Sequence, residues 1–257
     1  HIIATYDDVP FLDGEKYKSE ARRYQSEGRM IVGGRPVYPP HSLPWQVYIP
    51  PKWGVVDFCG GALISDQHVL TAAHCIISKA RFDVVVGEHS LSSSSDGTRH
   101  EVCHIANHPQ YANRLDTVGY VEYDFSILHL ERQVKFGEKV SKAELALPKF
   151  GGDFLATKML TVSGWGDDQW GGRPSDVLME VDVPVITQSE CKDNYSRKRI
   201  KHSMICAGWP NGKMDACQGD SGGMFSYQFL LQYCTPKYMI KYQYTILLLL
   251  IPIIVHT

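Results

Sequence analysis

The sequence lacks an excess of charge of either sign. Its 257 residues include 26 Lys and Arg against 28 Asp and Glu, which gives a net charge of −2. Because polyanionic partners are bound chiefly through clustered positive charge, we expect neither nucleic acid nor an anionic membrane as a partner. Long apolar runs are missing too, since the longest one, residues 246–255, is broken by Pro252. A spanning helix needs about 20 apolar residues, so no membrane span is predicted.

Helical periodicity is scarce before residue 187. No metal-ligand spacing such as His-Glu-x-x-His occurs in the sequence either. We therefore predict no metal and no cofactor. From residue 30 onward, short apolar stretches are separated by Gly, Pro, Ser, Asn and Asp. These stretches are residues 45–49, 62–64, 84–86, 126–130, 159–162 and 181–186. Such a pattern is typical of an all-β sandwich or barrel, and the serine tract 92–95 is interpreted as one surface loop.

The two ends of the chain differ from its middle. Residues 1–30 hold eleven charged residues and no cysteine, so we expect an extended, exposed segment. The chain begins with His1, is interpreted as a fragment, and shows no signal peptide. Residues 222–257 carry only two of the charged residues, Lys237 and Lys241, and 22 of these 36 residues are hydrophobic. We find no strand or helix period in the tyrosines of this stretch.

Five segments carry chemical information: Ile31–Gly34 (IVGG), Leu70–Cys75 (LTAAHC), Tyr123–Leu128 (YDFSIL), Ser163–Gly166 (SGWG) and Asp215–Gly223 (DACQGDSGG). In this order and spacing the chain resembles the chymotrypsin/trypsin family of serine endopeptidases over residues 31–223. The resemblance implies two antiparallel Greek-key β-barrels with the active site between them, and hydrolysis of peptide bonds through an acyl-enzyme.

By this resemblance Ser221 is the nucleophile, His74 the general base and acid, and Asp124 the orienting carboxylate. A serine hydroxyl is a poor nucleophile at neutral pH, so an imidazole must take its proton and a carboxylate must fix the imidazole tautomer. The order His, Asp, Ser matches chymotrypsin and differs from subtilisin. Phe125 departs from the small or aliphatic residue that usually follows the aspartate. The N–H groups of Gly219 and Ser221 are expected to form the oxyanion hole.

Substrate preference is expected from the residue six positions before the nucleophile, which in this family lies at the floor of the specificity pocket. Here it is Asp215, which implies cleavage after Arg or Lys, with Ala216 and Gln218 as further substrate-binding residues. Ala216 replaces a common serine, which removes one hydroxyl from the pocket. This loss should favour Arg over Lys, because a compact ammonium depends more on added hydrogen-bond partners.

The resemblance also implies a zymogen. Cleavage before Ile31 would free an ammonium that pairs with Asp220, so residues 1–30 would be a pro-segment. The residue before Ile31 is Met30, and Arg29 lies one position further back. A trypsin-type cut after Arg29 would leave the new terminus one residue too long. We therefore predict a cut after Met30 by a chymotrypsin- or elastase-like enzyme, or trimming of Met30.

Two disulfides follow from the resemblance: Cys59–Cys75 beside His74, and Cys191–Cys206. Of the other three cysteines, Cys217 has lost its usual partner, and Cys103 and Cys234 match no family position. The loop from Glu88 to Glu101 lies where some relatives bind calcium. Its serine-rich middle lacks most of the necessary carboxylates, so calcium is not predicted.

The resemblance ends abruptly after Gly223. The usual Pro is Met224, no Ser-Trp-Gly follows, and no amphipathic C-terminal helix is recognisable in residues 224–257. We expect a divergent apolar tail that replaces the last strands and the C-terminal helix, and an incomplete second barrel. A read-through, frameshift or alternative exon would explain the break, and a lipid-anchor signal is a rival explanation.

The sequence thus predicts a secreted trypsin-like endopeptidase made as a zymogen. Its expected partners are protein or peptide substrates with Arg or Lys, an activating protease and protein protease inhibitors. Two alternatives stay open because of the tail. One is a catalytically inactive homologue, and the other is a truncated or mis-spliced product that acts at most as a binding protein.

Overall fold

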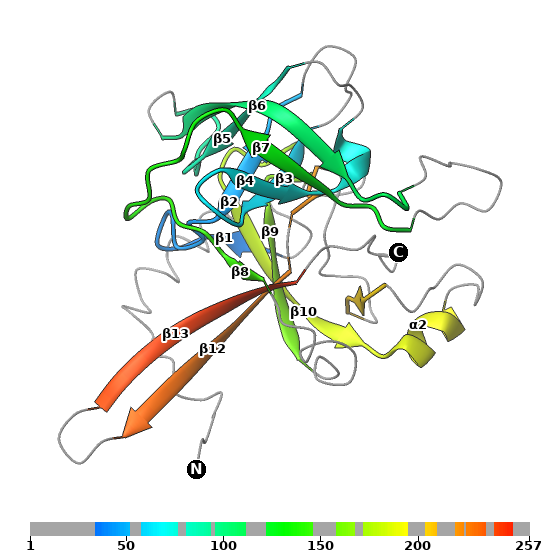
Figure 1. Cartoon of the computed structure of the whole chain (residues 1–257). Helices are drawn as coiled ribbons and strands as arrows, with labels where there is room; N and C mark the ends of the chain where they lie inside the picture. Colours follow the sequence, from blue (N-terminus) through cyan, green and yellow to red (C-terminus); the bar gives the residue numbers. More distant parts are fainter. Residues whose placement is uncertain are drawn as a thin grey trace.

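The chain is described by a computed structural model, which covers residues 34–51, 58–76, 81–93, 96–111, 122–145, 158–167, 172–194, 204–209, 219–223, 225–234 and 239–248. It is an all-β protein, as the turn-separated apolar stretches predict (Figure 1). Among the described residues, helix is confined to the 3-10 turn η1 (Ala73–Cys75) and to α2 (Gln188–Asn194). No helix in this part of the chain is long and apolar enough to cross a membrane.

The first half forms a closed barrel in the order β2-β3-β4-β7-β6-β5. Its strands are β2 (Gln46–Ile49), β3 (Cys59–Leu63), β4 (His68–Thr71), β5 (Asp83–Val86), β6 (Thr98–Asn107) and β7 (Ser126–Leu130). β-Branched residues suit a pleated, packed surface, and Val47, Val69 and Val84 are fully buried in the barrel core beside Leu128. Closure leaves this barrel without free strand edges.

The second half forms a sheet in the order β1-β10-β9-β12-β13-β8, with β11 attached to β10. Its strands are β1 (Arg35–Pro36), β8 (Glu144–Leu145), β9 (Met159–Gly164), β10 (Met179–Ile186), β11 (Cys206–Ala207), β12 (Phe225–Cys234) and β13 (Met239–Leu248). This order is an open path among the described strands.

The two halves meet over a buried cluster that includes Trp165 and Leu178. Trp165 is 1% exposed, and its indole N–H donates to the carbonyl of His89 at 3.1 Å. A second polar link is buried nearby, where the Ser163 hydroxyl donates to Oε1 of Gln46 at 2.8 Å. A buried polar group is costly unless it is paired, so these two bonds fix how the sheets meet.

We found no strand period in the tyrosines of residues 222–257, yet two strands form there. β12 and β13 pair as an antiparallel hairpin, and each strand has ten residues. The register pairs the two strands from Phe225 with Leu248 to Cys234 with Met239. The hairpin extends away from the body of the molecule (Figure 1).

Candidate active site

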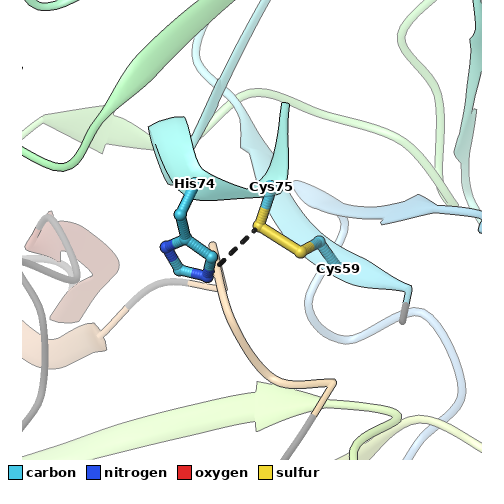
Figure 2. A group of neighbouring side chains, drawn as sticks. All are labelled: Cys59, His74 and Cys75. Atoms are coloured by element: carbon cyan, nitrogen blue, oxygen red, sulfur yellow. Dashed lines mark hydrogen bonds between the residues drawn. A yellow bond between two sulfur atoms is a disulfide. The ribbon is translucent and has the colours of Figure 1, made fainter. Parts of the chain in front are cut away.

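His74 lies on η1, the short turn that follows β4. Its neighbours Ala73 and Cys75 are buried, whereas the His74 side chain is 46% exposed. Cys75 is disulfide-bonded to Cys59 at the start of β3, with the two Cα atoms 6.2 Å apart. The turn is thus fixed to the barrel on one side of the imidazole, and the ring projects from the barrel surface (Figure 2).

Asp124 lies two residues before β7 and is 4% exposed. Its Oδ2 lies 2.6 Å from Nδ1 of His74, and its Oδ1 accepts the backbone N–H of His74 at 2.8 Å. Because a carboxylate only accepts, Nδ1 carries the hydrogen and Nε2 keeps its lone pair. Two contacts to one residue therefore set the orientation and the tautomer of this imidazole.

Phe125, the residue that departs from the family pattern, is accommodated beside Asp124. It is partly buried against the cluster between the two halves, and its ring centroid lies 4.6 Å from that of His108. The ring of His108 also stacks on Tyr123 at 4.7 Å. Phe125 N donates to the carbonyl of Tyr123 at 2.8 Å, which closes a tight turn around Asp124. The bulky residue packs away from the His74–Asp124 pair and does not disturb it.

Ser221 is held against the first barrel through its backbone. Its carbonyl accepts the N–H of Gly60 in β3 at 2.8 Å, and Sγ of Cys75 lies 3.6 Å from the same oxygen. Gly222 has φ +77°, and a Cβ there would collide with the Thr71 hydroxyl and the Gly60 carbonyl. Only glycine fits this close approach. Residues 219–223 thus reach the first barrel beside the turn that carries His74.

The Ser221 hydroxyl and the His74 ring are not joined in this conformation. Among the described residues, no hydrogen bond links Oγ of Ser221 to Nε2 of His74, and Nε2 instead lies 3.9 Å from Sγ of Cys75 (Figure 2). Catalytic hydrogen bonds are often long or misaligned before substrate binds. The structure therefore places Ser221 and His74 on either side of Cys75, but Oγ of Ser221 and Nε2 of His74 are not aligned for proton transfer.

Gly219 and Asp220 precede the nucleophile, and their surroundings explain why the motifs have glycine at positions 164, 166 and 219. Gly219 has φ +92°, and a Cβ there would lie 2.5 Å from the ring of Phe58. Asp220 is 2% exposed, and its Oδ1 accepts the N–H of Gly166 at 2.8 Å. A Cβ on Gly164 or Gly166 would collide with this carboxylate. The glycines of Ser163–Gly166 are thus required by the buried Asp220.

Several predicted residues lie outside the described part of the chain. These are Ile31, Asp215, Ala216, Gln218 and the unmatched Cys217. Both predicted disulfides are present, and Cys191–Cys206 joins α2 to β11. Cys103 is exposed and free on β6. Nothing is described of the Cys234 side chain.

The donor atoms of Cys59, His74 and Cys75 lie within 4.8 Å of one another (Figure 2). Such a group invites comparison with a thiolate metal site, in which each sulfur must be a free thiolate. Here the two sulfurs are bonded to each other in the Cys59–Cys75 disulfide. The cluster therefore positions the imidazole and supplies no thiolate ligand.

The loop between β5 and β6 is held by charges that the motifs did not reveal. Asp96 accepts the N–H groups of His89 and Ser90 at 3.0 and 3.1 Å. Its Oδ1 lies 3.2 Å from Nε2 of His41 and 3.4 Å from Nζ of Lys139. Burial opposes ionisation, but the Ser90 N–H, His41 and Lys139 outweigh it and lower the pKa of Asp96. The protein's own hydrogen-bond donors and the ammonium of Lys139 thus satisfy this carboxylate.

The family model described as Trypsin matches residues 31–228 of the chain. The mosquito protein "Trypsin 5G1" (Aedes aegypti) is 39% identical over 201 residues, which are 77% of this chain and 71% of that protein. The "Venom protease" of Bombus pensylvanicus is 36% identical over 75% of this chain and 80% of its own length. Mouse "Ovochymase-2" is 36% identical over 80% of this chain, but the chain spans only 34% of its length.

A solved structure of mouse brain neuropsin, a serine protease, superposes with a TM-score of 0.64 at 33% identity, over 75% of this chain and 80% of that one. It supports the same double-barrel architecture. The matched sequence includes the segments that carry His74, Asp124 and Ser221. The chain therefore belongs to the trypsin family of serine proteases.

Proposed function

We propose that this chain is a trypsin-like serine endopeptidase made as a zymogen, with residues 1–30 as pro-segment and 31–223 as protease domain. The observation that carries the proposal is the two-point contact of Asp124 with His74, beside the barrel-anchored backbone of Ser221. This arrangement leaves Nε2 of His74 free to accept a proton, which is what nucleophilic activation of a serine requires.

In the proposed reaction, Nε2 of His74 takes the Ser221 hydroxyl proton while Oγ attacks the peptide carbonyl carbon. The oxyanion is stabilised by the N–H groups of Gly219 and Ser221, and loss of one such donor costs about 3 kcal/mol. Imidazolium then protonates the leaving amine as the C–N bond breaks, which leaves an acyl-enzyme. Water, deprotonated by the same imidazole, hydrolyses the ester and restores Ser221.

Cleavage after Arg or Lys is proposed from Asp215 at the pocket floor, with Ala216 and Gln218 beside it. Its test is kcat/KM for matched Arg and Lys peptides. We expect a higher value for Arg, because Ala216 supplies no hydroxyl to an ammonium. Equal values would overturn the preference for Arg, and a lack of cleavage after either residue would overturn the assignment of Asp215.

Secretion is proposed because two disulfides are typical of oxidising compartments. A relative bears the name "Venom protease". The partners that we propose are protein or peptide substrates, an activating protease and protein protease inhibitors.

A second candidate is a catalytically inactive homologue, or a truncated product that acts as a binding protein. One observation favours it: the second sheet is open among the described strands, and the hairpin that follows Gly223 leaves the body instead of completing a barrel (Figure 1). No Ser-Trp-Gly wall of the substrate pocket follows residue 223 in the sequence.

One experiment separates the candidates. The chain is cleaved before Ile31 and mixed with an Arg-directed active-site titrant, with Ser221→Ala as the matched control. A stoichiometric acylation burst that the control lacks supports the enzyme. No burst from protein with an intact near-UV circular dichroism spectrum supports the inactive homologue, and no folded protein supports the truncated product.

A further inference from the structure

Three histidines lie side by side on three neighbouring strands of the first barrel. His129 of β7 is paired in register with His68 of β4 on one side and with His104 of β6 on the other. β4, β7 and β6 are consecutive strands of this closed barrel (Figure 1). Cβ atoms of directly opposed residues in an antiparallel pair lie about 4.5–5.5 Å apart, so each outer imidazole is within reach of the central one.

Burial along the strands shows that these histidines lie on the outer face of the barrel. The two residues that flank His129 in β7 are fully buried, whereas His129 itself is half-buried. In a regular strand His104 would share the core face with Val102, which is 3% exposed. Cys103 is the extra residue of a bulge at this point, so Cys103 and His104 are both exposed. The bulge therefore turns His104 outward, toward His129.

Two of the three imidazoles already contact each other. The ring centroids of His68 and His129 lie 4.8 Å apart, with the ring planes at 83°. Two imidazoles bound to one tetrahedral Zn²⁺ at about 2.0–2.1 Å have centroids about 5 Å apart, so this spacing suits a shared ion. Nδ1 of His68 lies 2.8 Å from Oγ of Ser65, and the tautomer that donates to this hydroxyl keeps a lone pair on Nε2. Metal-binding histidines are commonly oriented in this way, by a contact of the other ring nitrogen with an oxygen.

From this arrangement we propose that His68, His104 and His129 bind a divalent transition-metal ion, Zn²⁺, through their imidazole nitrogens. Three imidazoles with one position left for water are an established ligand set for tetrahedral Zn²⁺. The donor atoms of these three described residues are not all within 4.8 Å of one another, so binding requires one side chain to move. His104 is exposed, and an exposed side chain changes rotamer within nanoseconds.

The ion would join the strands that lead to and from the catalytic pair. β4 ends three residues before His74, and β7 begins two residues after Asp124. An ion that binds only the folded state adds its binding free energy to the stability of the barrel. The sequence predicted no metal, because these histidines come from three separate strands and form no short motif.

The test is isothermal titration of Zn²⁺ into the full chain, with Ser221→Ala and Cys103→Ser in every sample. The first substitution prevents self-digestion, and the second removes an exposed free thiol that would itself bind the ion. We expect one high-affinity Zn²⁺ per chain. The melting temperature should rise by about 5 °C when Zn²⁺ is in about hundredfold excess over its dissociation constant. Ca²⁺, which takes oxygen ligands, should produce neither effect.

Substitution of each ligand identifies the site. His129→Gln should weaken Zn²⁺ binding about a hundredfold, because it removes the central imidazole, and His68→Gln and His104→Gln should each weaken it about tenfold or more. His100→Gln, on the same strand as His104, is the matched control and should change the affinity less than about twofold. An unchanged near-UV circular dichroism spectrum and melting temperature without Zn²⁺ identify variants whose barrel is intact.

Three outcomes would overturn the proposal. The first is a lack of saturable Zn²⁺ binding by the folded chain, and the second is equal affinity in His129→Gln and His100→Gln. The third is an unchanged affinity in His104→Gln, which would exclude a site of three imidazoles. None of these readouts requires peptidase activity.

Discussion

Asp124 contacts both the ring and the backbone of His74, so exchanging one carboxylate oxygen for an amide nitrogen tests its role. In Asp124→Asn the amide N–H₂ can donate to Nδ1, which would place the hydrogen on Nε2, the wrong tautomer for accepting the Ser221 proton. We expect kcat/KM on an Arg peptide to fall about 10⁴-fold, with KM little changed. Circular dichroism confirms folding, and retention of even a tenth of the activity would contradict the assigned role.

Glu88 is a partly buried carboxylate whose Oε1 has no hydrogen-bond partner among the described residues. Burial, followed by the charges of Asp96 and Asp176, raises its pKa above the ordinary 4.5. The folded state then holds the proton more tightly than the unfolded state, so stability falls as pH rises through this range. Glu88→Gln removes the ionised form that is penalised at neutral pH.

We therefore expect Glu88→Gln to raise the melting temperature at pH 7 by about 2–4 °C and to have no effect near pH 4. Differential scanning calorimetry from pH 4 to 8 measures it. Glu131→Gln, on an exposed loop, is the control. A stabilisation equal at both pH values would show that the effect is not ionic. Destabilisation that appears only with added calcium would instead identify Glu88 as a ligand.

At the scale of residues, the sequence is most informative where the constraint is local. His74, Asp124 and Ser221 follow from short segments in which the glycines are forced by close approach, as Gly222 against Thr71 and Gly166 against Asp220 demonstrate. The hydrogen bond between Ser163 and Gln46 was missed, because it joins residues 117 positions apart. No local pattern identifies which of many polar residues will meet across two sheets.

At the scale of elements, the described residues of the loop between β5 and β6 are bonded to the segment that precedes β10. Asp176 accepts hydrogen bonds from the backbone and hydroxyl of Ser92, both at 2.9 Å, and from the Ser90 hydroxyl at 3.1 Å. The backbone ladder continues through Leu91 N to the Asp176 carbonyl and Leu178 N to the His89 carbonyl, both at 2.8 Å. The loop thereby ties the first barrel to the approach to β10.

Asp176→Ala should weaken the attachment of this loop, because the Ser90 hydroxyl and the Ser92 N–H and hydroxyl lose their acceptor. We expect amide hydrogen exchange of Leu91 and Leu178 to accelerate about tenfold, which corresponds to about 1.4 kcal/mol. Exchange of Val85 in the barrel core should not change, and Glu138→Ala on another exposed loop is the control. Equal exchange of Leu91 in Asp176→Ala and the wild-type chain would show that the backbone pairs hold the loop alone.

Strand prediction succeeded where apolar residues cluster and failed where burial is one-sided. Five of the apolar stretches coincide closely with β2, β5, β7, β9 and β10. β6 was missed because most of its residues are exposed or half-buried and a bulge near Cys103 interrupts its register. β12 and β13 were missed because their tyrosines stand at odd positions in β12 and at even positions in β13, so no single period of two runs through residues 222–257.

For the whole molecule, the proposed activation links the terminus at Ile31 to a carboxylate deep between the two halves. Asp220 is 2% exposed and is packed on the backbone of Gly164 and Gly166. An ammonium paired with Asp220 would order Gly219 and Ser221, the two chain neighbours of Asp220. Cleavage before Ile31 would in this way form the oxyanion hole. The residue at which the new N-terminus begins matters, because a buried ion pair is stabilising only when its two charges are in close contact.

A chain that begins at Met30 should therefore give an active-site burst about 10²-fold smaller than one that begins at Ile31, since losing one partner of a buried pair costs about 3 kcal/mol or more. Cutting after Arg29 with trypsin and after Met30 with a chymotrypsin-like enzyme produces the two forms, and N-terminal sequencing identifies them. Aminopeptidase removal of Met30 should restore the burst. Asp220→Asn should abolish it in both forms, because the ammonium then has no charged partner. A full burst from the chain that begins at Met30 would show that this protein orders its oxyanion hole by another route.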